Sequence, residues 1–177
     1  DNGLQACRDA NVRLNTLAQE QLVNASEVDF TTIQYHIDFT GTDQFNLDNP
    51  NDPSSRVTFY GVSEPPATVL DGSEFSGITF DITEEDIDRR SLEDPLFDVS
   101  IENITSPDDV VSVNVAVTSN VDFNDQIVVQ AAVVEDDVVF EGTTYNNILK
   151  NLLFGGEGRT IDITWNQGTM QTQSDER

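Results

Sequence analysis

The residue types that most often carry catalysis or bind transition metals are rare in this chain of 177 residues, which has one cysteine, Cys7, and one histidine, His36. One cysteine cannot form a disulfide within the chain, and two such residues fall short of the roughly four ligands of a structural zinc site. A Ser-His-Asp or Cys-His enzyme would need His36 as its general base. Thiol or hydrolytic chemistry therefore depends on where the chain places these two side chains.

His36 lies within residues 31–39, where apolar and polar side chains alternate. This alternation predicts a β-strand with one buried face. The apolar face carries Ile33, Tyr35, Ile37 and Phe39. His36 falls on the opposite face, together with Gln34 and Asp38. We therefore expect a hydrogen-bonded structural histidine rather than a catalytic base.

Cys7 lies within residues 4–20, whose apolar side chains recur at the three- and four-residue spacing of an amphipathic helix. The apolar stripe carries Cys7, Ala10, Leu14, Leu17 and Ala18. A lone cysteine on such a stripe is more often a small buried hydrophobe than a reactive thiolate. We predict that the chain is not an enzyme, and a single-cysteine thiol enzyme, peroxidase-like or isomerase-like, is kept as an alternative.

Carboxylates dominate the charge of the chain, because 33 acidic and 8 basic side chains leave a formal net charge of −25. Binding nucleic acid through its phosphates, or docking on an anionic membrane, requires clustered Lys and Arg and is therefore excluded. No run approaches the roughly 18 apolar residues of a membrane helix, so no membrane insertion is expected. Seven of the eight basic residues are arginine. Abundant carboxylate with one lysine predicts a halophilic protein, adapted to salt.

Acidic loops suggest a second alternative, a calcium- or carbohydrate-binding surface module. Calcium could bind around Asp43–Asp52 or Asp122–Asp125, but the chain has no calcium loop of about 12 residues with an Asp ladder and a closing Glu. An exposed Trp165 or Tyr145 could stack on a sugar, although Trp165 shares a predicted strand face with two isoleucines and is expected in the core. We predict no metal site and no cofactor. The clusters expected to be solvated turns are Asp48–Asp52, Glu84–Asp88 and Glu135–Asp137.

The first half of the chain is predicted to mix helices, strands and loops. The elements are a helix over 4–20, a strand over 31–39, a loop over 41–55, a segment over 56–62 that fits a helix or an extended piece, a strand over 67–70 and a helix over 83–92. The dipeptide Asp71-Gly72 predicts a tight turn after the strand at 67–70. Thr83 and Asp86 have the spacing of a capping box at the start of the last helix.

The composition changes near Pro95, after which the chain is rich in valine with a period of two. The predicted elements are strands over 97–101, 111–117, 126–134, 138–140 and 159–165, a helix over 146–154, and a frayed polar end over the last dozen residues. Regular spacing and polar turns favour an antiparallel sandwich or sheet. The predicted domains are therefore residues 1–93 and 94–177. The predicted core consists of Leu14, Leu17, Ile33, Tyr35, Ile37, Val69, Val113, Val115, Val129, Val133, Ile161 and Trp165.

The first half resembles a thioredoxin-like domain. The resemblance rests on the strand Ile33–Asp38, the loop containing Asp43, and the stretch Arg56–Gly72 with its aromatic-Gly-Val segment, paired prolines and Asx-Gly turn. It implies a cis proline, which by position is Pro66. The cis form costs far less free energy in an X–Pro peptide bond than in other peptide bonds.

The second half resembles the C-terminal region of an outer-membrane lipoprotein family of Bacteroidetes-type bacteria. The matching stretches are Val128–Val138, Tyr145–Lys150 and Gly158. That family pairs a thioredoxin-like domain with a β-domain in this order. The resemblance implies an extracellular, cell-surface or periplasm-facing location, with other envelope or surface proteins as partners.

Departures from the redox pattern decide the expected function. Redox thioredoxins open the helix with Cys-x-x-Cys, in which one thiolate attacks and the second cysteine resolves. Here Cys7 falls at the second place and Leu4 at the first, so dithiol chemistry is not expected. The first thioredoxin strand is missing before the helix, so the domain is expected to be incomplete and the chain an excerpt of a longer polypeptide.

Open strand edges invite pairing with other chains, including copies of this one. The sequence therefore predicts an incomplete thioredoxin-like α/β domain followed by an all-β, sandwich-like antiparallel domain with one short helix. The predicted function is a non-catalytic binding or assembly module of the cell envelope or exterior, such as a subunit of a surface complex or filament.

Overall fold

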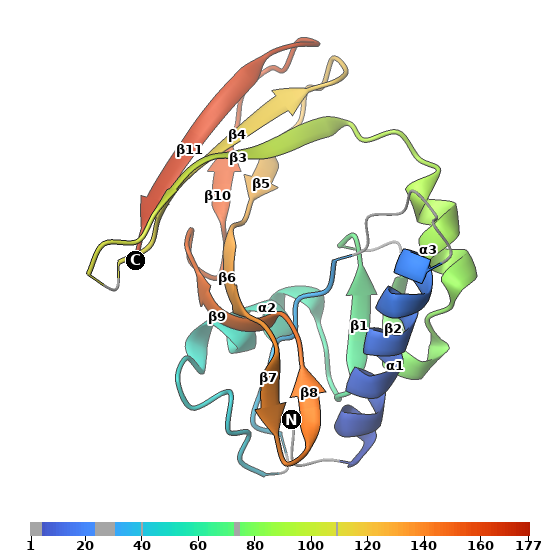
Figure 1. Ribbon diagram of the computed structural model, residues 1–177. Helices are drawn as coiled ribbons and strands as arrows, with labels where there is room; N and C mark the ends of the chain where they lie inside the picture. The colour runs from blue at the N-terminus through green and yellow to red at the C-terminus, as the bar shows by residue number, and fades with distance from the viewer. Residues whose placement is uncertain (1–4, 24–30, 40, 73–74, 109) are drawn as a thin grey trace. The chain divides into compact units, whose positions relative to one another are not determined.

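The computed structural model describes residues 5–23, 31–39, 41–72, 75–108 and 110–177 (Figure 1). Within these residues, 3 α-helices are combined with 11 strands in several small antiparallel sheets. The predicted fold class, α/β combined with antiparallel β, is confirmed at this level. None of the described helices is long and apolar enough to span a membrane.

The chain divides into two compact units. Unit 1 comprises Asp1–Glu93 and Val134–Asn151, and unit 2 comprises Asp94–Val133 and Leu152–Arg177. The first division falls after Glu93, next to the composition change, but residues 134–151 differ from the sequence-based assignment because they belong to unit 1. Backbone hydrogen bonds show why: the Gln34 N–H donates to the Asn147 carbonyl at 2.9 Å, and the Leu149 N–H donates to the Gln34 carbonyl at 3.0 Å.

Unit 1 contains all three α-helices. Its elements are α1 (Gln5–Val23), α2 (Asn51–Tyr60), the hairpin of β1 (Ala67–Leu70) and β2 (Phe75–Ile78), a 3₁₀ turn (Thr79–Asp81), α3 (Glu84–Ser91), and the hairpin of β7 (Val138–Phe140) and β8 (Thr143–Tyr145). The segment left open by the sequence, 56–62, is helical up to Tyr60. The Pro65–Pro66 bond is cis, as the resemblance implied. Asp71 and Gly72 take the positive φ values, 42° and 81°, of the predicted turn.

The strand predicted over residues 31–39 is wrong. These residues make only an isolated parallel bridge, between Gln34 and Ile148. The predicted faces are also reversed at three positions, because Ile33 and Phe39 are 40% and 44% exposed whereas His36 is buried. Polar partners on neighbouring segments, described below, hold His36 inside and Gln34 half-buried, whereas Asp38 is exposed.

The helix predicted over residues 146–154 is also wrong, because Ile148–Leu152 form strand β9, which pairs with β6 (Ala132–Glu135). Spacing alone cannot separate a buried strand from a helix in a short apolar run. The last dozen residues, expected to fray, instead form β11 (Met170–Glu176), whose seven residues all pair with β4. The half-buried positions that alternate along β11 are polar, so the sequence has no alternation of apolar and polar residues that would predict a strand.

Helix α3 begins at the predicted capping box. The Asp86 N–H donates to the Thr83 hydroxyl oxygen at 3.3 Å, and the Thr83 N–H donates to the Asp86 carboxylate at 3.0 Å. Hydrogen bonds from the Thr83 side chain and backbone lower the pKa of Asp86. Because the folded pKa is the lower one, this stabilisation is present above the ordinary carboxyl pKa and is lost as the pH falls through the lowered value. The cap orients Ile87, which packs against Leu17 and Ile82 in the core of unit 1.

Replacing Thr83 by alanine is expected to destabilise unit 1 by about 1 kcal/mol, because one helix N–H loses its side-chain acceptor. The pKa of Asp86 should rise toward its ordinary value in the same variant. Urea denaturation and an NMR titration of the Asp86 carboxyl measure the two effects. The exposed Thr31 provides a control, and equal losses in T31A and T83A would contradict the role of the cap.

Unit 2 is built from short antiparallel sheets. One sheet has the strand order β11-β4-β3, with β3 (Phe97–Thr105) and β4 (Ser112–Ser119), and another pairs β10 (Arg159–Ile161) with β5 (Ile127–Val129). The strand predicted over 126–134 is therefore divided into β5 and β6. Position 158 requires glycine, because its φ is 78° and a Cβ there would lie 2.6 Å from Val128 Cγ1.

The core of unit 2 is centred on Trp165, which is fully buried. Seven buried residues form this cluster: Val113, Val115, Val117, Val129, Leu153, Ile161 and Trp165. Of the twelve predicted core positions, six are buried: Leu17, Val113, Val115, Val129, Ile161 and Trp165. Five others are half-buried: Leu14, Tyr35, Ile37, Val69 and Val133. The exposed Ile33 is the one wrong prediction among them.

Candidate functional site

The histidine lies in a buried polar cluster of unit 1. His36 Nδ1 lies 2.8 Å from Asp43 Oδ2, and His36 Nε2 lies 3.3 Å from Gln34 Oε1. Asp43 is fully buried, and its other carboxylate oxygen accepts the Phe45 N–H at 2.8 Å. The prediction of a hydrogen-bonded histidine is confirmed. Both ring nitrogens therefore have side-chain partners within unit 1.

The same cluster connects three parts of unit 1 that are far apart in sequence. Gln34 Nε2 donates to Asn11 Oδ1 at 2.7 Å, and Asn11 Nδ2 donates to the Thr144 carbonyl at 2.8 Å. Asp38 accepts the Asp43 N–H at 2.6 Å. The polar residues of 31–39 thus bind α1 and the following loop, and Asn11 of α1 in turn binds β8. Buried polar groups with partners of this kind fix one arrangement of the chain and act structurally.

Aromatic rings surround the histidine. The His36 ring packs edge-on against Phe45 and Tyr145, with centroid distances of 4.8 Å and 5.7 Å. Tyr145 is 1% exposed, and its hydroxyl has no hydrogen-bond partner among the described residues. Burial raises the pKa of Tyr145. Since Tyr145 and Trp165 are both buried, neither ring is available to stack on a sugar, and this part of the carbohydrate alternative is wrong.

The cysteine lies on helix α1. Cys7 is a free thiol and is only partly buried, so the expected full burial is not met. Leu4, the residue at the place of the first redox cysteine, lies outside the described residues. Over the described ranges, no group of three or more His, Cys, Asp or Glu side chains is arranged to hold a metal ion.

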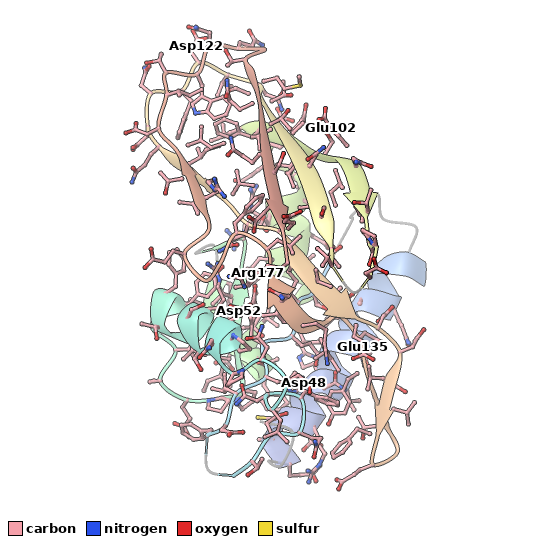
Figure 2. All side chains as sticks on the ribbon, turned by 90° about the vertical axis from the view of Figure 1, so that its left-hand side faces the viewer. Asp48, Asp52, Glu102, Asp122, Glu135 and Arg177 are labelled. Carbon is pink, nitrogen blue, oxygen red and sulfur yellow. The ribbon has the colours of Figure 1, made fainter. Side chains whose placement is uncertain are left out.

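The acidic loops use their carboxylates in turns and ion pairs. Lys150 Nζ lies 2.7 Å from Asp48 and 3.3 Å from Glu135, both labelled in Figure 2. The hydrogen bond to Asp48 is the main cause that raises the pKa of Lys150. Asp122 accepts the Gln167 N–H at 2.9 Å. Asp48 and Glu135–Asp137 are exposed, as expected for solvated turns. The same expectation is wrong for Asp52, which is buried in α2, and for Glu84–Asp88, which lie in α3.

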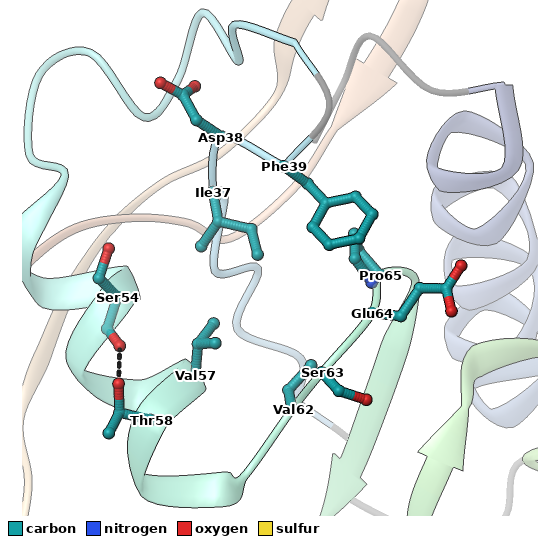
Figure 3. A pocket seen from close by; sticks show the side chains of 10 residues that line it. All are labelled: Ile37, Asp38, Phe39, Ser54, Val57, Thr58, Val62, Ser63, Glu64 and Pro65. Carbon is teal, nitrogen blue, oxygen red and sulfur yellow. Dashed lines mark hydrogen bonds between the residues drawn. The ribbon is translucent and has the colours of Figure 1, made fainter.

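A shallow cleft of about 270 Å³ lies in unit 1 (Figure 3). Its lining is Ile37, Asp38, Phe39, Ser54, Val57, Thr58, Val62, Ser63, Glu64 and Pro65. In Figure 3 the carboxylates of Asp38 and Glu64 point away from the apolar middle of the cleft. The cleft therefore offers apolar contact and hydroxyl groups but no inward acid or base.

Exposed apolar side chains lie along strand β3 of unit 2, an edge strand of the sheet β11-β4-β3. Its nine residues are almost all exposed. Three of them are large and apolar, with exposed fractions of 64% for Val99, 60% for Ile101 and 59% for Ile104. We call these three residues the β3 stripe.

The β3 stripe lies on the core side of its sheet. Val99 pairs with Val117, Ile101 with Val115 and Ile104 with Val113, and directly paired residues share one face. The three β4 partners are buried, at 1% to 4% exposure, whereas the stripe is open. A bulge between Ile101 and Asn103 keeps Ile104 on the stripe's side. The core face of this sheet is therefore covered over β4 and uncovered along β3.

The other face of β3 is polar and acidic. Asp98, Ser100 and Glu102 alternate with the stripe, and all three are exposed; Glu102 is labelled in Figure 2. The sequence predicted strand 97–101 but gave no sign that its apolar face would be open. With its outer backbone edge unpaired in the described residues, β3 can accept a further strand.

Comparisons with protein-family models, with curated proteins and with solved structures find no match for this chain.

Proposed function

We propose that this chain is a non-catalytic binding or assembly module of the cell envelope or exterior, and that a partner docks along β3. The observation that carries the proposal is the β3 stripe, which leaves three large apolar side chains exposed beside a strand edge that no described strand pairs with. Most proteins protect long edge strands with charges, prolines, bulges or covering segments. A nine-residue edge with one bulge and an open apolar face fits a surface that is covered in a complex.

The chemistry of the rare residues supports a role without catalysis. His36 is held by Asp43 and Gln34, and Cys7 has no second cysteine with which to form a disulfide. A binding module needs neither a general base nor a redox pair.

The element order of unit 1 supports a thioredoxin-like scaffold that has lost its redox function. Along the chain it has α1, the extended residues 31–39, α2, the paired prolines, the hairpin β1–β2 and α3. Residues 31–39 would be the central strand of such a domain, although they make only one bridge here. An envelope or extracellular location is supported by the resemblance of residues 128–138 and by the excess of carboxylates, which suits a saline exterior.

The proposal is tested by capture experiments with the full chain. The immobilised chain, incubated with an extract of the source organism at about 0.15 M salt, should retain a defined set of proteins. The variant V99S/I101S should lose that set, and C7A should retain it. V139S is a matched control, because Val139 on β7 is 70% exposed and outside the stripe. A set that depends on Cys7 and not on the stripe would contradict the proposal.

A further inference from the structure

We infer that the occupant of β3 is an extended segment of another protein in which apolar side chains alternate with lysine or arginine. This inference rests on the proposed function and names the chemistry of the partner. An added strand pairs its backbone with the open edge and presents its side chains alternately to the two faces of the sheet. Each face of β3 therefore specifies one half of the partner's pattern.

The core-side face requires apolar residues. Val99 and Ile101 are two residues apart, and Ile104 follows after the bulge, so the stripe runs along most of the strand. Apolar side chains of an added strand would lie beside the stripe and remove it from water. A polar side chain on that face would leave the stripe exposed along its other side.

The outer face requires positive charge. Asp98, Ser100 and Asn103 lie on this face, and Glu102 lies next to Asn103 at the bulge. Asp98, Ser100 and Glu102 are exposed. Opposite charges placed directly across two strands stabilise a sheet, whereas like charges destabilise it. Lysine or arginine at alternate positions of the added strand would face these two carboxylates. The net charge of −25 attracts such a segment over a longer range.

The same charges argue against a second copy of this chain as the occupant. Antiparallel pairing of two β3 strands can bring the stripes together by placing Val99 opposite Ile101 of the other copy. In that register Asp98 of one copy faces Glu102 of the other, twice in the interface. Each whole chain also carries a charge of −25. Charge complementarity therefore favours a basic partner over self-pairing.

The probe is a labelled peptide of alternating valine and lysine, and its binding to the full chain is followed by fluorescence anisotropy. Two matched peptides serve as controls: one has glutamate in place of lysine, and one has proline at two central positions, which removes backbone donors. We expect the valine–lysine peptide to bind at least roughly tenfold more tightly than either control, since both the charges and the ladder contribute.

Variants of the protein separate strand addition from general attraction to an acidic surface. D98K/E102K should reverse the preference, so that the valine–glutamate peptide binds more tightly. E85K/D88K makes the same change of net charge at two exposed positions of α3 and should keep the original preference. V99S/I101S should weaken binding of the valine–lysine peptide at least roughly tenfold.

Four results would overturn the inference. Equal binding of the proline peptide, or equal effects of E85K/D88K and D98K/E102K, would show attraction without strand addition. Sedimentation that finds a dimer lost in V99S/I101S would make a second copy the occupant. Absence of peptide binding, with capture from the extract still dependent on the stripe, would overturn the partner's chemistry and leave the proposed function standing. Loss of stripe-dependent capture would instead overturn the proposed function.

Discussion

Replacing Val117 by aspartate is expected to unfold unit 2, with a loss of about 3–5 kcal/mol that arises from burying an unpaired carboxylate. Val117 is 1% exposed and lies in the cluster that contains Trp165. Trp165 is the chain's single tryptophan and is fully buried, so its fluorescence reports on this core. The emission of V117D should shift to the red in buffer, as it does for the wild type only in urea.

The chain provides a matched control for this variant on the neighbouring strand. Val99 pairs directly with Val117, has the same side chain on the same face, and is 64% exposed. Because an exposed carboxylate keeps its water, V99D should cost less than about 1 kcal/mol. Similar losses in V99D and V117D would mean that β3 is covered on its core side, and would contradict the open stripe.

Replacing Asp43 by alanine is expected to destabilise unit 1 by about 2–4 kcal/mol, because a fully buried acceptor of two hydrogen bonds is removed. The His36 ring and the Phe45 N–H lose their partner together. D43N should be intermediate, since an amide oxygen can still accept one of the two hydrogen bonds. Urea denaturation followed by far-ultraviolet circular dichroism measures these losses.

Asp88 provides the control for the buried carboxylate. It is exposed on α3, and D88A should change stability by less than about 0.5 kcal/mol. If D43A and D88A behave alike, the cluster of His36 and Asp43 does not hold residues 31–39 in place. A free energy of unfolding that increases from D43A to D43N to the wild type is the outcome that supports a structural role for the histidine.

Elements with local signals could be predicted from the sequence. The capping box of Thr83 and Asp86, the turn at Asp71-Gly72, and the alternation of Val113, Val115 and Val117 each depend on neighbouring residues only. Such signals are complete within one turn or one strand face. The corresponding elements α3, β1 and β4 lie close to where they were expected.

Segments whose environment is set by distant residues could not be predicted. Within residues 31–39, Gln34 is half-buried and His36 is buried because Asn11 and Asp43 satisfy their polar groups. Hydropathy cannot predict those distant partners. Residues 148–152 have an apolar spacing that a helix shares with a strand buried on both faces. Strand β11 is polar and is held by its pairing with β4.

The candidate surface was only partly accessible to sequence reasoning. The strand was expected from the alternation of Phe97, Val99 and Ile101, and open edges were expected in general. Whether an apolar face is buried depends on which segments pack over it, and these segments cannot be predicted from the sequence of the strand alone. The exposure of Val99 and Ile101 is therefore information that the structure adds.

Hydrogen exchange of the β3 amides in the free, full chain tests the open edge most directly. In an antiparallel edge strand, alternate N–H groups bond to the inner neighbour and the others point away. Along Phe97–Thr105 we predict two alternating classes, one protected by β4 and one exchanging as in an unstructured chain, with the second class protected when the valine–lysine peptide is added. Uniform protection of β3 in the free monomer would contradict the account, because the edge would already be paired.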